Sequence, residues 1–146
     1  MYKNILVPTD GSDFSMIAVR HAIKLAKFHG SKITGITVVT GLSEHVALEG
    51  HTLEDVQTDF KALSEEHGRQ ALKPLVEAAL EEGLEPELHY FKNVSPHEGI
   101  ILAAKNHKCD LIVMATHARR GVSALLLGNE AQKVIAQSPV PVLVVR

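Results

Sequence analysis

The sequence contains few residues of several kinds, and each shortage narrows what the chain can be. Its 146 residues include one cysteine, no tryptophan, four phenylalanines and two tyrosines. A single cysteine excludes a disulfide within the chain. Because aromatic side chains are so few, the hydrophobic core must consist mainly of Val, Ile, Leu and Ala. Cys109 stands just before an apolar run, so we interpret it as a small core residue rather than a reactive thiol.

The chain also lacks an excess of basic residues, long apolar runs and a recognisable leader. Its 15 Lys and Arg residues are balanced by 17 Asp and Glu residues, for a formal net charge of −2. Nucleic-acid binders usually carry a strong basic excess, so we expect no nucleic-acid partner. No apolar run approaches the roughly 18 residues that a membrane span needs. The N-terminus has no basic and apolar segments of the signal-peptide kind. We therefore expect a cytoplasmic protein with no membrane partner.

Five short runs predict β-strands. Four of them are apolar almost throughout and do not alternate, which is typical of parallel strands buried on both faces. These four are Ile5–Val7, Ile33–Val39, Leu111–Ala115 and Val140–Val145. The fifth, Glu87–Phe91, alternates more between polar and apolar residues, which favours a place at the edge of the sheet.

Apolar residues at helical spacing predict helices between these strands. In the first helix Ser12 can act as N-cap and Gly30 can end the helix. A longer pattern runs from about Val56 to Glu82 and is closed by Gly83. Pro74 lies inside this pattern and predicts a kink or a break.

Two further helices complete an alternating order of strands and helices. Ser95–Glu98 has the capping-box pattern of a helix start, and a last short helix is expected over about Asn129–Gln137. The stretch from Thr40 to about Asp55 predicts a mobile surface loop. Strands that alternate with helices indicate an α/β fold with a parallel sheet and helices on both faces. The length fits a single domain over residues 1–146.

The loop after the first strand is the first candidate site. In open parallel sheets, ligands bind beyond the carboxyl ends of the strands, where the strand order reverses. Pro8–Ser12 has this position, and Asp10 can accept a hydrogen bond from a ribose or an adenine group. Gly11 allows the chain to turn closely around a ligand. The alternative is a plain strand–helix turn in which Asp10 and Ser12 act as local caps.

The loop after the fourth strand, Met114–Glu130, is the second candidate site. It leads into a helix near Asn129, and a helix N-terminus attracts anions through its backbone N–H groups and dipole. Gly128 leaves room for a phosphate, and Arg119 and Arg120 add positive charge. The alternative assigns the arginines to solvent and Gly128 to a backbone turn.

The nine histidines raise the question of a metal site. They lack the close ligand spacing of motifs such as HExxH or CxxC, so we interpret them as scattered surface residues and predict no metal site. His117 is the exception to watch, because it lies in the second loop and could donate to an anion when protonated.

Three segments together resemble the universal stress protein family. They are "ILVPTDGSDFS", "CDLIVMATHARRGVSALLLGNEAQKVI" and "PVPVLVVR", and the resemblance covers the entire chain. It implies an open, Rossmann-like five-stranded parallel sheet in the order 3-2-1-4-5, similar to that of the adenine nucleotide alpha hydrolases. It also implies a stress-response regulator that holds ATP or AMP, with Mg²⁺ if ATP, and no permanent cofactor. No catalysis beyond slow ATP hydrolysis is expected.

The resemblance also assigns residues to the nucleotide. The aspartate that matches Asp10 contacts the nucleoside, backbone near the end of the second strand meets the adenine, and the second loop wraps the phosphates. Together with their neighbours in the two loops, these positions give the predicted nucleotide-binding residues: Pro8, Thr9, Asp10, Val38, Val39, Met114, Ala115, His117, Ala118, Arg119, Gly128, Asn129 and Glu130.

The phosphate loop departs from the family pattern of Gly, two residues, Gly, nine residues, Gly, then Ser or Thr. Ala115 and Ala118 replace two glycines, Asn129 replaces the hydroxyl residue, and only Gly128 is retained. An alanine held at positive φ costs about 1 kcal/mol or slightly more, and two would weaken binding roughly 30- to 150-fold. Two hypotheses follow: a weak adenine-nucleotide site, or a nucleotide-free dimeric interaction module on the same fold.

The C-terminal run suggests a second function. In the resembled family the last strand pairs with its twin across a two-fold axis, which would cover a sticky edge and give a homodimer. The residues concerned here are Val142, Leu143, Val144 and Val145. The plainer interpretation is an internal strand buried by helices, and the two interpretations are compatible. The sequence leaves the protein partner of such a dimer unknown.

Overall fold

Helices and strands alternate from one end of the chain to the other. The computed structural model of the protein describes residues 1–39, 53–92, 94–116 and 128–146, and for residues 53–60 the backbone alone. The elements in these ranges are β1 (Asn4–Pro8), α1 (Ser15–His29), β2 (Lys32–Val39), α2 (Leu53–Glu81), β3 (Glu87–Lys92), α3 (Pro96–Asn106), β4 (Leu111–Ala115), α4 (Asn129–Gln137) and β5 (Val142–Val145). The predicted order of elements is confirmed.

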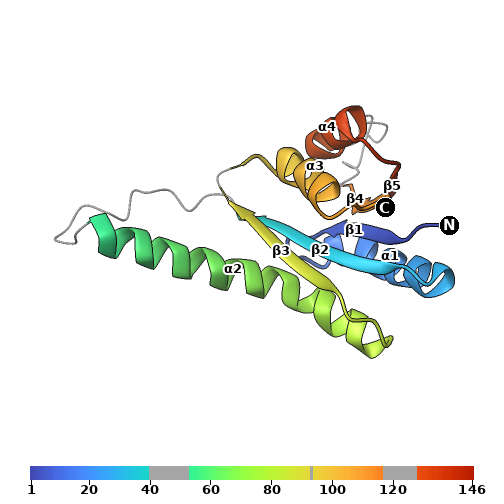
Figure 1. The fold of residues 1–146 in the computed structure, drawn as a ribbon, viewed down its shortest axis with the longest axis horizontal. Coiled ribbons are helices and arrows are strands. Elements are labelled where there is room, and N and C mark those ends of the chain that lie inside the picture. The colour runs from blue at the N-terminus through green and yellow to red at the C-terminus, as the bar shows by residue number, and fades with distance from the viewer. Residues whose placement is uncertain (40–52, 93, 117–127) are drawn as a thin grey trace.

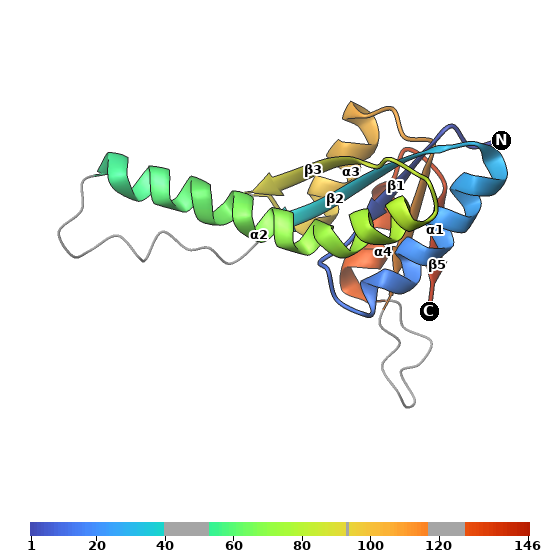
Figure 2. The ribbon, with the colours of Figure 1, turned by 90° about the horizontal axis from the view of Figure 1, so that it is seen from below.

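The five strands form one parallel sheet in the order β3-β2-β1-β4-β5 (Figure 1). Helices α3 and α4 cover one face, and α1 and α2 cover the other, as the view from below shows (Figure 2). This is the predicted fold class with the predicted strand order. The reversal of strand order lies at β1, which has β2 on one side and β4 on the other.

Side chains of β1 pack into two separate hydrophobic cores. Ile5 and Val7 pack into the aliphatic core beneath α1 and α2, while Leu6 packs into the core beneath α3 and α4. Successive side chains of a strand point to opposite faces, so a central strand covered by helices on both sides must be apolar almost throughout. This requirement explains why an uninterrupted apolar run, rather than an alternating one, marks the central strand.

Both edges of the sheet are now identified. β3 is an edge strand, which confirms the expectation from its alternating sequence. β5 occupies the opposite edge, so the alternative of an internal last strand is wrong. The strand begins at Val142 rather than Val140. Pro141 has no N–H to give to a ladder, and its carbonyl instead accepts a bond of 3.0 Å from the Ile112 N–H.

Helix α2 differs most from its prediction. It begins at Leu53, so the last residues of the expected 40–55 loop are helical, and residues 40–52 lie outside the described part of the chain. The predicted break at Pro74 is wrong, because the helix continues through it to Glu81. Leu72 and Leu75 on either side are buried against the sheet, and this packing outweighs the hydrogen bond that proline removes. Among the described residues, no helix is both long and apolar enough to cross a bilayer.

Two of the three predicted helix caps are confirmed. The exception is Ser12, because α1 begins at Ser15 with Phe14 at the N-cap position, although the Ser12 hydroxyl accepts the Ser15 N–H at 3.2 Å. Gly30 ends α1 in the left-handed conformation. At α3 the capping box is present, with the Ser95 N–H donating to Glu98 Oε2 at 3.1 Å.

Gly11, in the turn after β1, lies against the backbone of α2. Its φ is +79°, and a Cβ at this position would be 2.9 Å from the carbonyl oxygen of Ala71. Glycine is therefore required here by helix packing, whatever else the turn does. Gly83, after α2, has a similar φ of +75° but open space around the same position.

These two glycines give a matched test of the packing. We expect Gly83→Ala to lower the free energy of unfolding by about 1 kcal/mol, the usual cost of alanine at positive φ. Gly11→Ala should lower it by roughly 2–4 kcal/mol, because the new methyl group also collides with backbone that cannot rotate away. Urea unfolding followed by circular dichroism measures both. Equal losses would show that α2 does not press on the turn.

Cys109 lies in the core beneath α3 and α4, as predicted. Burial disfavours the thiolate and raises the pKa of the Cys109 thiol to about 11, although a hydrogen bond with Thr34 partly opposes the rise. The thiol is therefore protonated and unreactive at neutral pH.

Thiol trapping tests this assignment. At pH 8 we expect the folded protein to react with an aromatic disulfide reagent at least about 100-fold more slowly than the chain unfolded in urea. A rise of about two pKa units removes that much thiolate, and burial hinders access further. Reagent absorbance gives both rates on the same single cysteine. Similar rates would place Cys109 at the surface.

Candidate functional site

A cleft of about 320 Å³ lies where β1, β2 and β4 end. It is bounded by the turn after β1, the last residues of β2 and β4, and the start of α3. The residues that line it are Pro8, Thr9, Asp10, Ser12, Phe14, Ser15, Ile36, Thr37, Val38, Pro96, Ile100, Met114 and Ala115. The first loop and the beginning of the second thus meet at the point where the strand order reverses.

Asp10 lies exposed at the rim of this cleft. Its Oδ1 accepts hydrogen bonds from the Ser12 N–H at 3.0 Å and the Ser12 hydroxyl at 2.6 Å. Partial burial opposes ionisation, but the hydrogen bonds from Ser12 and Ser15 outweigh it and lower the pKa of Asp10. The local hydrogen bonding expected of a strand–helix turn is therefore present. It leaves the carboxylate negatively charged and facing solvent.

Thr9 stabilises the turn after β1 through hydrogen bonds of its backbone and its buried side chain. The N–H of Thr9 donates to the Ile36 carbonyl at 2.9 Å, joining the end of β1 to β2. Its hydroxyl accepts the Gly11 N–H at 3.0 Å and lies 2.7 Å from the Ser15 hydroxyl. The buried Thr9 side chain therefore shapes the turn that presents Asp10.

The strain considered for the phosphate loop is absent at Ala115. This residue ends β4, and Lys108 alone among the described non-glycine residues has a positive φ. The methyl group of Ala115 therefore adds bulk to the cleft but no backbone strain. Ala118 lies outside the described residues, as do His117, Arg119 and Arg120.

Gly128 is held by a residue that sequence reasoning missed. Its N–H donates to the hydroxyl of Thr116 at 2.9 Å, which joins the start of α4 to the end of β4. The φ of Gly128 is −55°, and a Cβ there would lie 3.4 Å from the same hydroxyl oxygen. Glycine is thus not required by the backbone angle. Asn129 follows as the exposed first residue of α4.

Glu130 connects α4 to the start of α3. Its Oε2 accepts the His97 N–H at 2.9 Å and lies 3.0 Å from His97 Nδ1, while Oε1 accepts from Lys133 Nζ at 3.0 Å. Partial burial raises the pKa of Glu130, but the bonds from Lys133 and His97 outweigh it and lower that pKa overall. This carboxylate serves as an anion at the N-terminus of α3. The carboxylate of a predicted ligand-binding residue is thus already bound by groups of the protein itself.

The structure adds side chains to the cleft that no motif indicated. Phe14, Ile36, Thr37, Pro96 and Ile100 all line it. Val38 lines it as predicted, whereas the half-buried Val39 is not among the lining residues. The signal that could have found Ile36 and Thr37 was their place near the end of a strand beside β1, which depends on strand order rather than on spacing in the sequence.

A larger groove of about 840 Å³ runs between α2 and the outer edge of β3. Its walls carry both charges and the apolar side chains of Leu72, Val76 and Leu88. We place the candidate site in the smaller cleft, because strand ends and the start of a helix converge there and such places bind ligands in open α/β sheets.

Comparison with known proteins gives one consistent family. The family model described as the universal stress protein family matches residues 1–146. A universal stress protein of Methanocaldococcus jannaschii is 37% identical over 146 residues, which is 100% of this chain and 83% of that protein. A universal stress protein of Thermus aquaticus is 32% identical over 146 residues and is covered, like this chain, over its full length.

Solved structures agree with the sheet order described above. A hypothetical protein of M. jannaschii, solved as a test case for assigning function from structure, superimposes with a TM-score of 0.78 at 26% identity, covering 99% of this chain and 96% of that chain. A universal stress protein in complex with cAMP superimposes with a TM-score of 0.72 at 25% identity, covering 99% of this chain and 97% of that chain.

Proposed function

Because the chain belongs to the universal stress protein family, we propose that it binds an adenine nucleotide in the cleft at the ends of β1, β2 and β4. The observation that carries the proposal is the pairing of apolar walls with a charged acceptor at the rim. Ile36, Ile100 and Met114 are buried apolar residues of the cleft, and Asp10 lies at its edge. The similar protein solved with cAMP supports the choice of ligand.

The chemistry of an adenine nucleotide matches these features. A flat purine base gains from apolar walls, and small-molecule sites are usually apolar with a few placed polar groups. The ribose hydroxyls can donate to Asp10, whose bonds from Ser12 use one oxygen, since a carboxylate has about four acceptor positions. The phosphates would extend towards Ala115, Gly128 and Asn129.

The proposed affinity is weak but measurable. Ala115 has no positive φ, so at most Ala118 could be strained among the two alanines. One strained alanine costs about 1 kcal/mol, or roughly a five- to tenfold loss of affinity. The protein would act as a cytoplasmic stress-response regulator that binds ATP, with Mg²⁺, or AMP, and hydrolyses ATP slowly at most.

The rival function is a nucleotide-free interaction module. It is favoured because two groups that were predicted to bind the nucleotide already have partners within the protein. The Gly128 N–H donates to Thr116, and the Glu130 carboxylate is bound by His97 and Lys133. Both functions are compatible with the same fold, so only a binding measurement separates them.

Calorimetric titration of ligand-free protein with ATP plus Mg²⁺, AMP and cAMP tests the proposal. We expect saturable binding, weakened roughly 10- to 100-fold by Asp10→Asn, because a hydrogen bond to a charged group contributes about 1.5–3 kcal/mol. Asp13→Asn removes another exposed charge from the same turn and is the matched control, since Asp13 is not among the lining residues. It should bind like the wild type.

Two outcomes would count against the proposal. No heat at millimolar nucleotide would leave the nucleotide-free module as the better function. Equal affinities of the Asp10→Asn and Asp13→Asn variants would remove Asp10 from the site. The combined change Ala115→Gly, Ala118→Gly and Asn129→Ser should tighten ATP binding, and an unchanged affinity would reject the assigned phosphate loop.

We also propose a homodimer through β5. The strand lies at an edge of the sheet, and Leu143 is 38% exposed there, while Val142 and Val144 are half-buried and Val145 is buried. An exposed apolar edge favours pairing with another strand, and a two-fold axis would bring the two copies of β5 together.

The other edge of the sheet supplies a control for this dimer. Leu88 on β3 is 39% exposed, almost the same as Leu143. We expect Leu143→Glu to convert the dimer to a monomer in sedimentation experiments, since two like charges would meet near the axis, whereas Leu88→Glu should remain dimeric. Dimers of both variants, or monomers of both, would contradict pairing through β5.

A further inference from the structure

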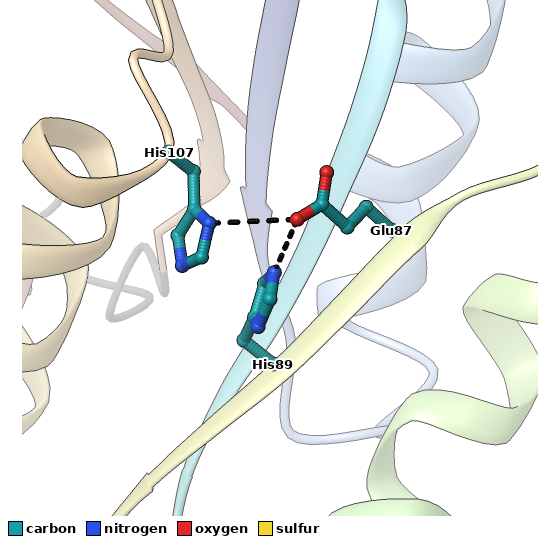
Figure 3. Close-up of side chains that lie close together, drawn as sticks. All are labelled: Glu87, His89 and His107. Carbon is teal, nitrogen blue, oxygen red and sulfur yellow. Dashed lines mark hydrogen bonds and ion pairs between the residues drawn. The ribbon is translucent and has the colours of Figure 1, made fainter.

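Glu87, His89 and His107 converge near the amino ends of the strands, away from the cleft (Figure 3). His89 Nε2 lies 2.8 Å from Glu87 Oε1, and His107 Nδ1 lies 3.5 Å from the same oxygen. The two imidazole rings stack with centroids 3.7 Å apart. One carboxylate oxygen therefore lies between two imidazole nitrogens.

Regular structure brings these side chains together. Glu87 and His89 are two residues apart on β3, so they point to the same face of the sheet. Their backbone is fixed by pairing with β2, where Glu87 lies opposite Thr34 and His89 opposite Ile36. The positions therefore depend on the sheet and not on a loose loop.

His107 comes from the end of α3 and is fixed by a second set of bonds. Its carbonyl accepts from the Asn4 side-chain amide at 3.0 Å, and the Asn4 side-chain oxygen accepts the Thr34 hydroxyl at 3.0 Å. Asn4 thus links the C-terminus of α3 to β2, beside the strand that carries His89. All three ligand candidates are held by elements of the core fold.

The ligand atoms have the spacing that a small metal ion needs. One candidate ligand atom from each residue lies within 4.8 Å of the others. A tetrahedral ion with bonds of about 2.0–2.2 Å holds its ligand atoms roughly 3.4 Å apart. The distances of 2.8 and 3.5 Å to Glu87 Oε1 bracket that value, and the stacked imidazole rings must tilt apart so that both nitrogen lone pairs, which lie in the ring planes, point to one ion.

We propose that Glu87, His89 and His107 form a binding site for a divalent transition-metal ion, with Zn²⁺ the best match to two imidazoles and a carboxylate. Imidazole nitrogen suits zinc, copper and nickel, whereas magnesium prefers oxygen ligands. Three protein ligands leave a fourth position for water or another ligand.

The surroundings allow an ion to enter. The side chains of Glu87, His89 and His107 are 57%, 31% and 20% exposed, so solvent reaches the cluster while the imidazoles are partly shielded. A hydrogen bond from His89 outweighs a small desolvation effect and lowers the pKa of Glu87, so the carboxylate is charged at neutral pH. Lys32 is a further cation whose charge favours the ionised form of Glu87. Cys109 is buried in the core beneath α3 and α4 and is not part of the cluster.

A competition titration with ZnCl₂ and a chromophoric chelator tests the site on the untagged full chain. Seven of the nine histidines lie outside the cluster. The zinc affinity must therefore be compared between variants. We expect His89→Gln with His107→Gln to weaken the tightest zinc binding by at least about tenfold, as even indirect changes to metal sites do. The matched control is His21→Gln with His67→Gln, which removes two exposed histidines from helices α1 and α2.

Equal zinc affinities of the two double variants would overturn the proposal. NMR of the wild-type imidazoles gives a test that does not depend on any variant folding. Zinc should shift the His89 and His107 ring signals together at the first equivalent, before those of His21 and His67. First shifts at other histidines would assign the zinc to those residues instead. Glu87→Gln should weaken binding as well, and an unchanged affinity would remove the carboxylate from the site.

Discussion

The burial of β1 between two helical layers is the constraint on which the rest of the structure depends. Ile5, Leu6 and Val7 have no exposed surface at all, and both neighbouring strands hydrogen-bond to β1. Between Asn4 and Pro8, where β1 is buried on both faces, only apolar side chains fit. The first polar groups that can meet solvent are therefore those of the turn after Pro8, which is where the cleft and Asp10 lie.

The same constraint explains which parts of the fold could be predicted from the sequence. Strands with two covered faces must be apolar almost throughout, so the runs around Ile5, Ile33 and Leu111 were visible without any structure. Local hydrogen bonds were equally readable, since the capping box at Ser95 and the bounds of the last helix, Asn129–Gln137, were predicted correctly. The break predicted at Pro74 was wrong because helix propensity, a local property, takes no account of the burial of its neighbours in α2.

The site was less predictable because its contacts join residues that are distant in sequence. No periodicity or spacing connects Thr116 with Gly128, or Glu130 with His97, yet each pair is hydrogen-bonded. The histidines show the same limit. His89 and His107 belong to no short motif, and only the packing of α3 on β2, the strand beside β3, brings their rings into contact. A search for close ligand spacing in the sequence could not have indicated this cluster.

The contact between Gly11 and α2 restricts how this protein can change. The atoms nearest to a Cβ at position 11 are the carbonyl oxygen, Cα and carbonyl carbon of Ala71, all of them backbone. A smaller or larger side chain at position 71 would leave these atoms where they are, so no partner substitution there can compensate for a change at position 11. The turn that carries Asp10 can therefore be altered only if the whole helix shifts with it.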